Sequence, residues 1–217
     1  MSYWQWDSNS KRYRVTAEGA EALNQRVGTY VSNTRMLELR ESVITSAKNR
    51  VNELASSLAS GDININQWTL AMRQEVKDSF IHQYMLGHGG RNTMTQSDWG
   101  KLGHDIRDQY QYLNRFSDEI RAGRYTESQI AARSRMYMEA SSQSFEKAKV
   151  ASRGIPDLPD YPGSGRTECM TNCKCYWNIK ETETEWLCYW SLSNVEHCDS
   201  CIDRSNRWNP LVISKNK

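Results

Sequence analysis

All six cysteines of this 217-residue chain lie between Cys169 and Cys201, and no cysteine precedes them. So many thiols in so short a segment are explained either by disulfides in an oxidising compartment or by a metal ion bound to thiolates. The N-terminus shows no cationic and apolar stretch of the kind that forms a secretory signal. Together with the tight cysteine spacing, this favours a metal site in a reducing compartment.

The segment that carries the cysteines, residues 167–217, predicts a small folded module. Apolar residues alternate with polar ones on two expected strands, with Trp177 and Ile179 before a turn at 181–184 and Trp186, Cys188, Trp190 and Leu192 after it. A short helix is expected over 199–208, with Cys198 and Cys201 in its first turn. A knuckle, a β-hairpin and such a helix predict a treble-clef-like zinc module.

Tetrahedral Zn²⁺ takes four ligands, and five cysteines compete for the four positions. The metal-ligand candidates, of which we expect four to bind, are Cys169, Cys173, Cys175, Cys198 and Cys201. Cys169 and Cys173 fit the first pair best, with Cys175 as the alternative. Cys188 is interpreted as a small buried hydrophobic residue. His197 could replace one thiolate, although a role beside the site or at the surface is preferred. A closed set of thiolates indicates structural rather than catalytic zinc.

Residues 16–153 have the spacing of amphipathic helices and predict a bundle of about four helices, so the fold class is mainly α. The apolar stripes include Leu37, Ile44, Ala47, Val51, Leu54 and Leu58 in one helix, and Trp68, Met72, Val76, Phe80 and Tyr84 in the next. Gly61, the glycines at 87–90 and Gly123 are expected to end helices. Asn66, Thr95 and Thr126 are expected to begin them, the last helix running from Thr126 toward Ala148.

Two further segments complete the predicted domain organisation. Residues 1–15 are rich in aromatic side chains and predict a small hairpin or arm, which must dock either on its own bundle or on a neighbouring subunit. Residues 154–166 hold three of the four prolines and three glycines, and predict an extended, semi-rigid linker between the helical domain and the cysteine module.

Charge and hydropathy exclude several classes of function. The 28 basic and 26 acidic residues nearly cancel, so net charge alone does not indicate nucleic-acid binding. No apolar stretch is long enough for a membrane span, and no membrane partner is expected.

No catalytic constellation emerges from the sequence, and we expect no enzyme. The loop around His88 is rich in glycine but lacks the strand before it and the Lys-Ser/Thr after it that phosphate-binding loops need. His82, His88, His104 and Asp105 could form a nuclease-like cluster, but their spacing matches no metal-binding pattern.

The C-terminal segment resembles the tail of tailed-phage minor head proteins, also called head-morphogenesis proteins. The resemblance lies in the run from Glu168 to Ile179, the strand at 189–192, the Glu-His-Cys-Asp-Ser-Cys sequence at 196–201 and the ending at 208–211. Stretches at 83–90, 94–99 and 130–137 also look like phage and prophage proteins of this type. Cys188 lies outside the family pattern, and the toxin-like domains fused to some members are not visible here.

The resemblance implies a virion protein, assembled in the host cytoplasm, that acts near the portal or inner capsid. The expected partners are the portal protein, the major capsid protein and further copies of this chain as a homo-oligomer. The expected function is structural, in head assembly, with zinc stabilising a module for protein contacts.

The alternative is a zinc module that binds nucleic acid in packaging or regulation. Basic and aromatic residues in the module could contact phosphates and bases: Lys174, Lys180, Arg204, Arg207, Tyr176 and Trp177. Against this, Glu181, Glu183 and Glu185 crowd the tip of the predicted hairpin.

Overall fold

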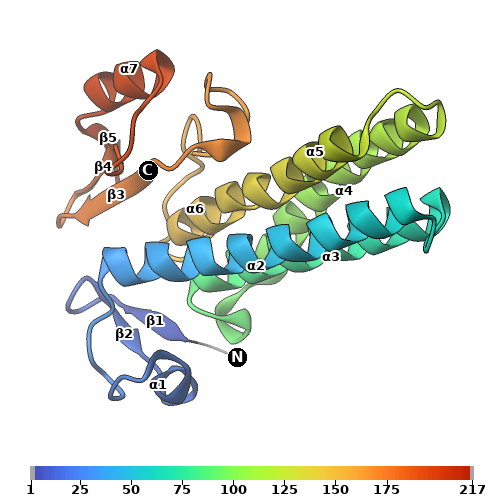
Figure 1. Cartoon of the computed structure of the whole chain (residues 1–217). Helices are drawn as coiled ribbons and strands as arrows, with labels where there is room; N and C mark the ends of the chain where they lie inside the picture. Colours follow the sequence, from blue (N-terminus) through green and yellow to red (C-terminus); the bar gives the residue numbers. More distant parts are fainter. Residues whose placement is uncertain (1–2, 216–217) are drawn as a thin grey trace.

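The computed structural model describes residues 3–215 and has a long helical body with small β elements at one end (Figure 1). The N-terminal part consists of β1 (Trp4–Asp7), β2 (Arg12–Val15) and α1 (Ala17–Leu23). The helical body consists of α2 (Asn33–Ser60), α3 (Ile65–His88), α4 (Gln96–Arg121), α5 (Glu127–Ala140) and α6 (Ser142–Ala151), with a 3₁₀ turn at Arg91–Thr93. The C-terminal part consists of a 3₁₀ turn at Met170–Asn172, β3 (Tyr176–Glu181), β4 (Glu185–Ser191), α7 (Asp199–Arg207) and β5 (Leu211–Ser214). The predicted mainly-α fold with a small β part is confirmed.

Local sequence signals set most helix ends. Ser32 caps α2, which ends at Gly61 in the left-handed conformation. Thr95 and Thr126 form capping boxes with Asp98 and Gln129, as their spacing predicts. The cap of α3 is Asn64, two residues earlier than expected.

Two helices differ from the expected lengths for identifiable reasons. The helix predicted from Thr126 toward Ala148 is interrupted at Ser141, whose hydroxyl donates to the Met138 carbonyl and closes α5. Helix α3 instead passes through Gly87 and ends at Gly89. Gly87 permits a close approach of α6, because a Cβ there would lie 2.1 Å from the Phe145 carbonyl oxygen.

Helix α3 is the centre of the body and packs against α2, α4, α5 and α6. Its predicted stripe is buried, and Trp68 meets Phe116 edge-to-face with 5.7 Å between ring centroids. The apolar residues at four-residue spacing therefore form the main core, as amphipathic periodicity requires.

The N-terminal hairpin docks on its own chain. Strands β1 and β2 pair antiparallel, and Trp4 is fully buried in a cluster with Leu86 of α3 and Phe145 of α6. The guanidinium of Arg153 stacks over the Trp6 ring at 4.1 Å. Residues 1 and 2 of the predicted arm lie outside the described residues.

The segment predicted as a linker packs as part of the C-terminal core. Ile155, Leu158 and Tyr161 are buried among the cysteines and tryptophans of the module. The indole N–H of Trp177 donates to the Asp160 carbonyl at 3.0 Å. The three prolines make the segment irregular, as predicted. However, its apolar side chains pack into the C-terminal core, so the segment is not a free linker.

A buried carboxylate joins the helical body to the C-terminal sheet. Glu146 of α6 accepts a hydrogen bond from the backbone N–H of Trp177 at 3.0 Å. The same carboxylate pairs with Arg40 of α2 and with Lys149, each at 3.2 Å, and all three side chains are almost fully buried. Strand β3 is therefore held against α6 by polar contacts as well as by packing.

The close approach of α6 at Gly87 predicts that alanine substitutions at two helical glycines, Gly87 and Gly100, change the free energy of unfolding in opposite directions. We expect Gly87→Ala to lower the free energy of unfolding by about 1–3 kcal/mol, because the new methyl group overlaps the α6 backbone. Gly100→Ala on α4 is the matched control, since nothing lies within 4 Å of a Cβ there. It should raise the free energy of unfolding by up to about 1 kcal/mol. Urea denaturation of both variants measures this, and equal stabilisation would contradict the described α3–α6 packing.

Candidate metal centre

The cysteines come from two places that the fold brings together. Cys169 and Cys173 flank the 3₁₀ turn at 170–172, which tightens the chain into a knuckle. Cys198 is the N-cap of α7, and Cys201 lies in the first turn of that helix, its N–H donating to the Cys198 carbonyl at 3.0 Å. Hairpin β3–β4 connects the two groups and pairs with β5. The knuckle, hairpin and helix therefore occur in the predicted order.

Three sulfur atoms have the spacing of ligands around one metal ion. The Sγ atom of Cys201 lies 3.7 Å from that of Cys169 and 3.5 Å from that of Cys173. The ligand atoms of these three residues all lie within 4.8 Å of one another. Zinc with Zn–S bonds of about 2.3 Å in tetrahedral geometry places its sulfur ligands about 3.8 Å apart. A disulfide has an S–S length of about 2.05 Å, so the spacing fits metal ligands rather than bonded pairs.

The other two candidate ligands adjoin these three. The Cys198 carbonyl accepts the backbone N–H of Cys201 at 3.0 Å, so Cys198 adjoins that ligand at the start of α7. Cys175 is fully buried and lies two residues after Cys173, directly before β3. Of the five candidates, Cys169, Cys173 and Cys201 have their sulfur atoms within metal-binding distance of one another, and Cys175 and Cys198 are the remaining candidates for the fourth position.

The pKa values of the thiols in the cluster are shifted in different directions by burial and by neighbouring thiols. A hydrogen bond from the Cys175 thiol lowers the pKa of Cys173 to about 5. Burial raises the pKa of Cys169 to about 11 and also raises the pKa of Cys201. The cluster without a cation therefore mixes thiolates with protonated thiols at neutral pH. A divalent metal displaces the thiol protons, because its charge offsets several thiolates at once.

Two residues near the cysteines have different surroundings. Cys188 is fully buried in β4, where it pairs with Ile179 of β3 and Leu211 of β5, and burial raises its pKa to about 11. His197 instead approaches the cluster, with its Nδ1 atom 3.6 Å from the Cys175 sulfur. The sequence put His197 next to Cys198, but it gave no sign of this contact with Cys175.

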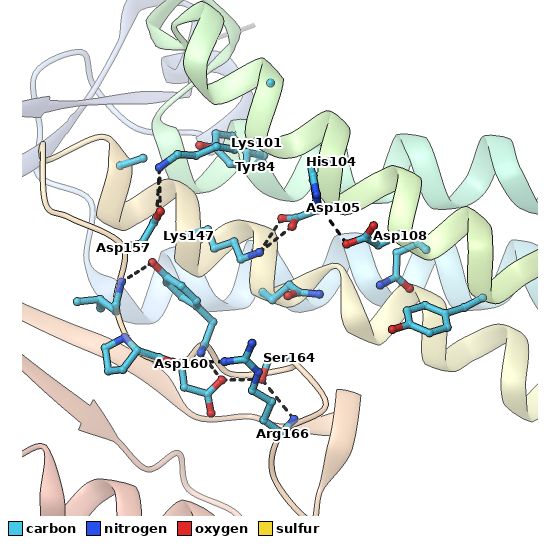
Figure 2. Close-up of a pocket in the computed structure, with 18 residues that line it drawn as sticks. Tyr84, Lys101, His104, Asp105, Asp108, Lys147, Asp157, Asp160, Ser164 and Arg166 are labelled. Carbon is cyan, nitrogen blue, oxygen red and sulfur yellow. Dashed lines mark hydrogen bonds and ion pairs between the residues drawn. The ribbon is translucent and has the colours of Figure 1, made fainter.

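The histidines considered for a nuclease site are not brought together. His82 is exposed, while His88 is buried and lies 3.4 Å from Asp98. Burial lowers the pKa of His88. On the wall of a cavity of about 760 Å³ between α4, α6 and residues 157–166, His104 pairs with Asp108 and Lys147 pairs with Asp105 (Figure 2). His104 and Asp105 therefore each face a partner of their own instead of a shared metal position.

The basic residues considered for nucleic-acid binding are partly engaged within the protein. Lys174 pairs with Glu41 of α2 at 2.8 Å, and Arg204 pairs with Asp160 at 2.8 Å. Lys180 lies over the ring of Tyr189. A phosphate backbone would have to compete with these contacts, which weakens the alternative hypothesis.

Comparisons with protein-family models, curated proteins and solved structures found no match for this chain. Within residues 3–215, none of the helices is both long enough and apolar enough to cross a bilayer. The geometry of the thiol cluster is therefore the main guide to function.

The sulfur geometry predicts different outcomes for two buried cysteines. Cys201→Ser should abolish stable metal binding, because the Cys201 sulfur lies 3.7 Å from that of Cys169 and 3.5 Å from that of Cys173. Cys188→Ser should keep the metal and lower the free energy of unfolding by about 1–3 kcal/mol, because it buries a hydroxyl among apolar groups. Elemental analysis after gel filtration with a weak chelator measures the metal. Equal metal content in the two variants would contradict the proposed site.

Proposed function

We propose that this protein is a non-enzymatic structural protein of a tailed-phage head, in which thiolate-bound zinc stabilises a module for protein–protein contacts. The observation that carries the proposal is the spacing of the Cys169, Cys173 and Cys201 sulfur atoms, which suits tetrahedral zinc. Thiolates in every coordination position leave none for substrate, so the zinc is structural rather than catalytic.

Zinc would complete a core that is small for independent folding. Trp177, Trp190 and Trp208 pack their rings with centroids 5.3–5.7 Å apart beside the cysteines. Metal ligation joins the knuckle before this core to helix α7 after it. The metal-binding free energy thus becomes folding free energy for the module, as in other small zinc domains.

Exposed apolar side chains around the centre support a role in protein contacts. Met170, Val195 and Ile202 are 49%, 55% and 42% exposed, and each lies within three residues of a candidate ligand. Exposed apolar groups beside a rigid site are typical of a docking face. The resemblance of the cysteine run to minor head proteins supports the portal or the major capsid protein as the partner, with the virion as the location.

The first test is native mass spectrometry of the full chain with and without a chelator. We expect bound zinc, a homo-oligomer, and loss of the metal with a lower melting temperature after chelation, because the C-terminal core depends on ligation. A metal-free monomer with paired thiols would overturn the proposal.

The second test concerns the partner. Ile202→Glu places a charge on the exposed face of α7 and should reduce incorporation into gradient-purified virions at least tenfold, with zinc content unchanged. Leu70→Glu is the matched control, since Leu70 is 71% exposed on α3, away from the cysteines, and should incorporate normally. Equal incorporation of both variants would exclude this face as the contact, and absence of the wild-type chain from virions would overturn the virion role.

A further inference from the structure

We propose that two copies of this chain pair with each other through the free edge of β5 (Leu211–Ser214), strand to strand and antiparallel. The inference rests on the proposed function, which expects a homo-oligomer, and it extends that function by naming the contact. The starting observation is that the three-stranded sheet has the order β3-β4-β5, so β3 and β5 are its two edges (Figure 1). An edge strand presents backbone groups with which another strand can pair.

The edge formed by β3 is covered by side chains of the protein itself. The N–H of Trp177 donates to the Glu146 carboxylate at 3.0 Å, and the Trp177 carbonyl accepts from the Lys149 ammonium at 2.9 Å. The Ile179 carbonyl accepts from the Arg153 guanidinium at 3.0 Å. These side chains occupy the positions that a further strand would need, so β3 is not available for pairing.

The edge formed by β5 is uncovered in the part of the chain that the structure describes. The N–H of Lys215 donates at 2.8 Å to the carbonyl of Thr184, the residue before β4. Since the backbone groups of an antiparallel strand alternate between its two sides, those of Val212 and Ser214 face away from β4. Among the described residues, no hydrogen bond from outside the sheet reaches these outward groups.

Strand β5 also lacks the features that protect a free edge. Natural edge strands are commonly shielded by charged side chains, prolines or bulges. The sequence of β5 is Leu-Val-Ile-Ser, with no charge and no proline, and Val212 is 49% exposed. The Lys215 ammonium that follows does not shield the edge, because it pairs at 2.8 Å with Glu181 of β3, on the opposite side of β4.

A second copy of β5 fits this edge. A two-fold axis at Ile213 places Val212 of each copy opposite Ser214 of the other, so that every outward N–H meets an outward carbonyl. The Ile213 side chains of the two copies then lie opposite each other, and β-branched residues pack well on a sheet. The uncharged strands bring no like charges together. Each β5 is already ordered by β4, whereas a flexible peptide would lose conformational entropy on binding.

The test is sedimentation velocity of the zinc-loaded full chain over a range of concentrations. We expect a dimer, and Val212→Pro should raise its dissociation constant at least about tenfold, because proline removes an N–H that faces the second copy. An edge strand tolerates proline where the missing N–H faces outward. The variant should therefore keep its fold and zinc, which circular dichroism and elemental analysis check.

Two further variants complete the design. Val212→Thr is the matched control, since it keeps the N–H and the branched side chain and should change the dissociation constant less than about twofold. Ser214→Pro removes the other outward N–H at the end of the strand and should also weaken the dimer, so the prediction remains testable if Val212→Pro fails to fold.

Amide hydrogen exchange measured by NMR gives an independent readout. The N–H groups of Val212 and Ser214 should exchange more slowly as the protein concentration rises, whereas that of Glu183 in the exposed turn between β3 and β4 should not change. A zinc-bound monomer at all concentrations, or a dimer that both proline variants leave unchanged, would overturn this inference and leave the structural zinc site standing. A zinc-free dimer that Val212→Pro weakens would uphold the inference and overturn the zinc site of the proposed function.

Discussion

The buried carboxylate of Glu146 is the contact on which the arrangement of this protein depends. It lies on α6 with no exposed surface, and it binds Arg40 of α2, Lys149 of its own helix and the backbone of Trp177 in β3. A buried charge is stable only when its partners are in place, and removal of one partner from such a pair typically costs about 3–5 kcal/mol. The helical body and the C-terminal sheet therefore keep one relative position.

The contacts of Glu146 also hold the candidate metal centre in a fixed orientation relative to the helical body. A module on a free linker would sample many orientations, but residues 154–166 are packed, and Trp177 is hydrogen-bonded at both its backbone N–H and its indole. The hairpin that connects the cysteine groups is thus held to α6 on one side. Metal ligation at the proposed site would order the other side as well, and the exposed apolar residues near the cysteines would then form a rigid face.

A rigid face suits a protein that occupies a fixed place in a larger assembly, because little conformational entropy remains to be lost on binding. The N-terminal hairpin also helps to hold the C-terminal sheet in place, because Lys11 at its tip pairs with Glu181 at the end of β3. Three parts of the chain that are distant in sequence therefore support the cysteine module. The proposed role in a phage head rests on the spacing of the cysteine sulfur atoms and on the resemblance of the cysteine run, and this rigidity agrees with it.

Local signals in the sequence determined the helices, most of their ends, the β3–β4 hairpin and the gathering of the cysteines. These features depend on contacts within a few residues, such as the capping box of Thr126 with Gln129 or the alternation of Trp177 and Ile179. The tertiary structure alone decided that the hairpin arm docks on its own chain, that residues 154–166 are buried, and that His197 meets Cys175. Those contacts join residues far apart in the chain, and their free energy comes from packing and from desolvation of charges such as Glu146. No local pattern of residues encodes that geometry.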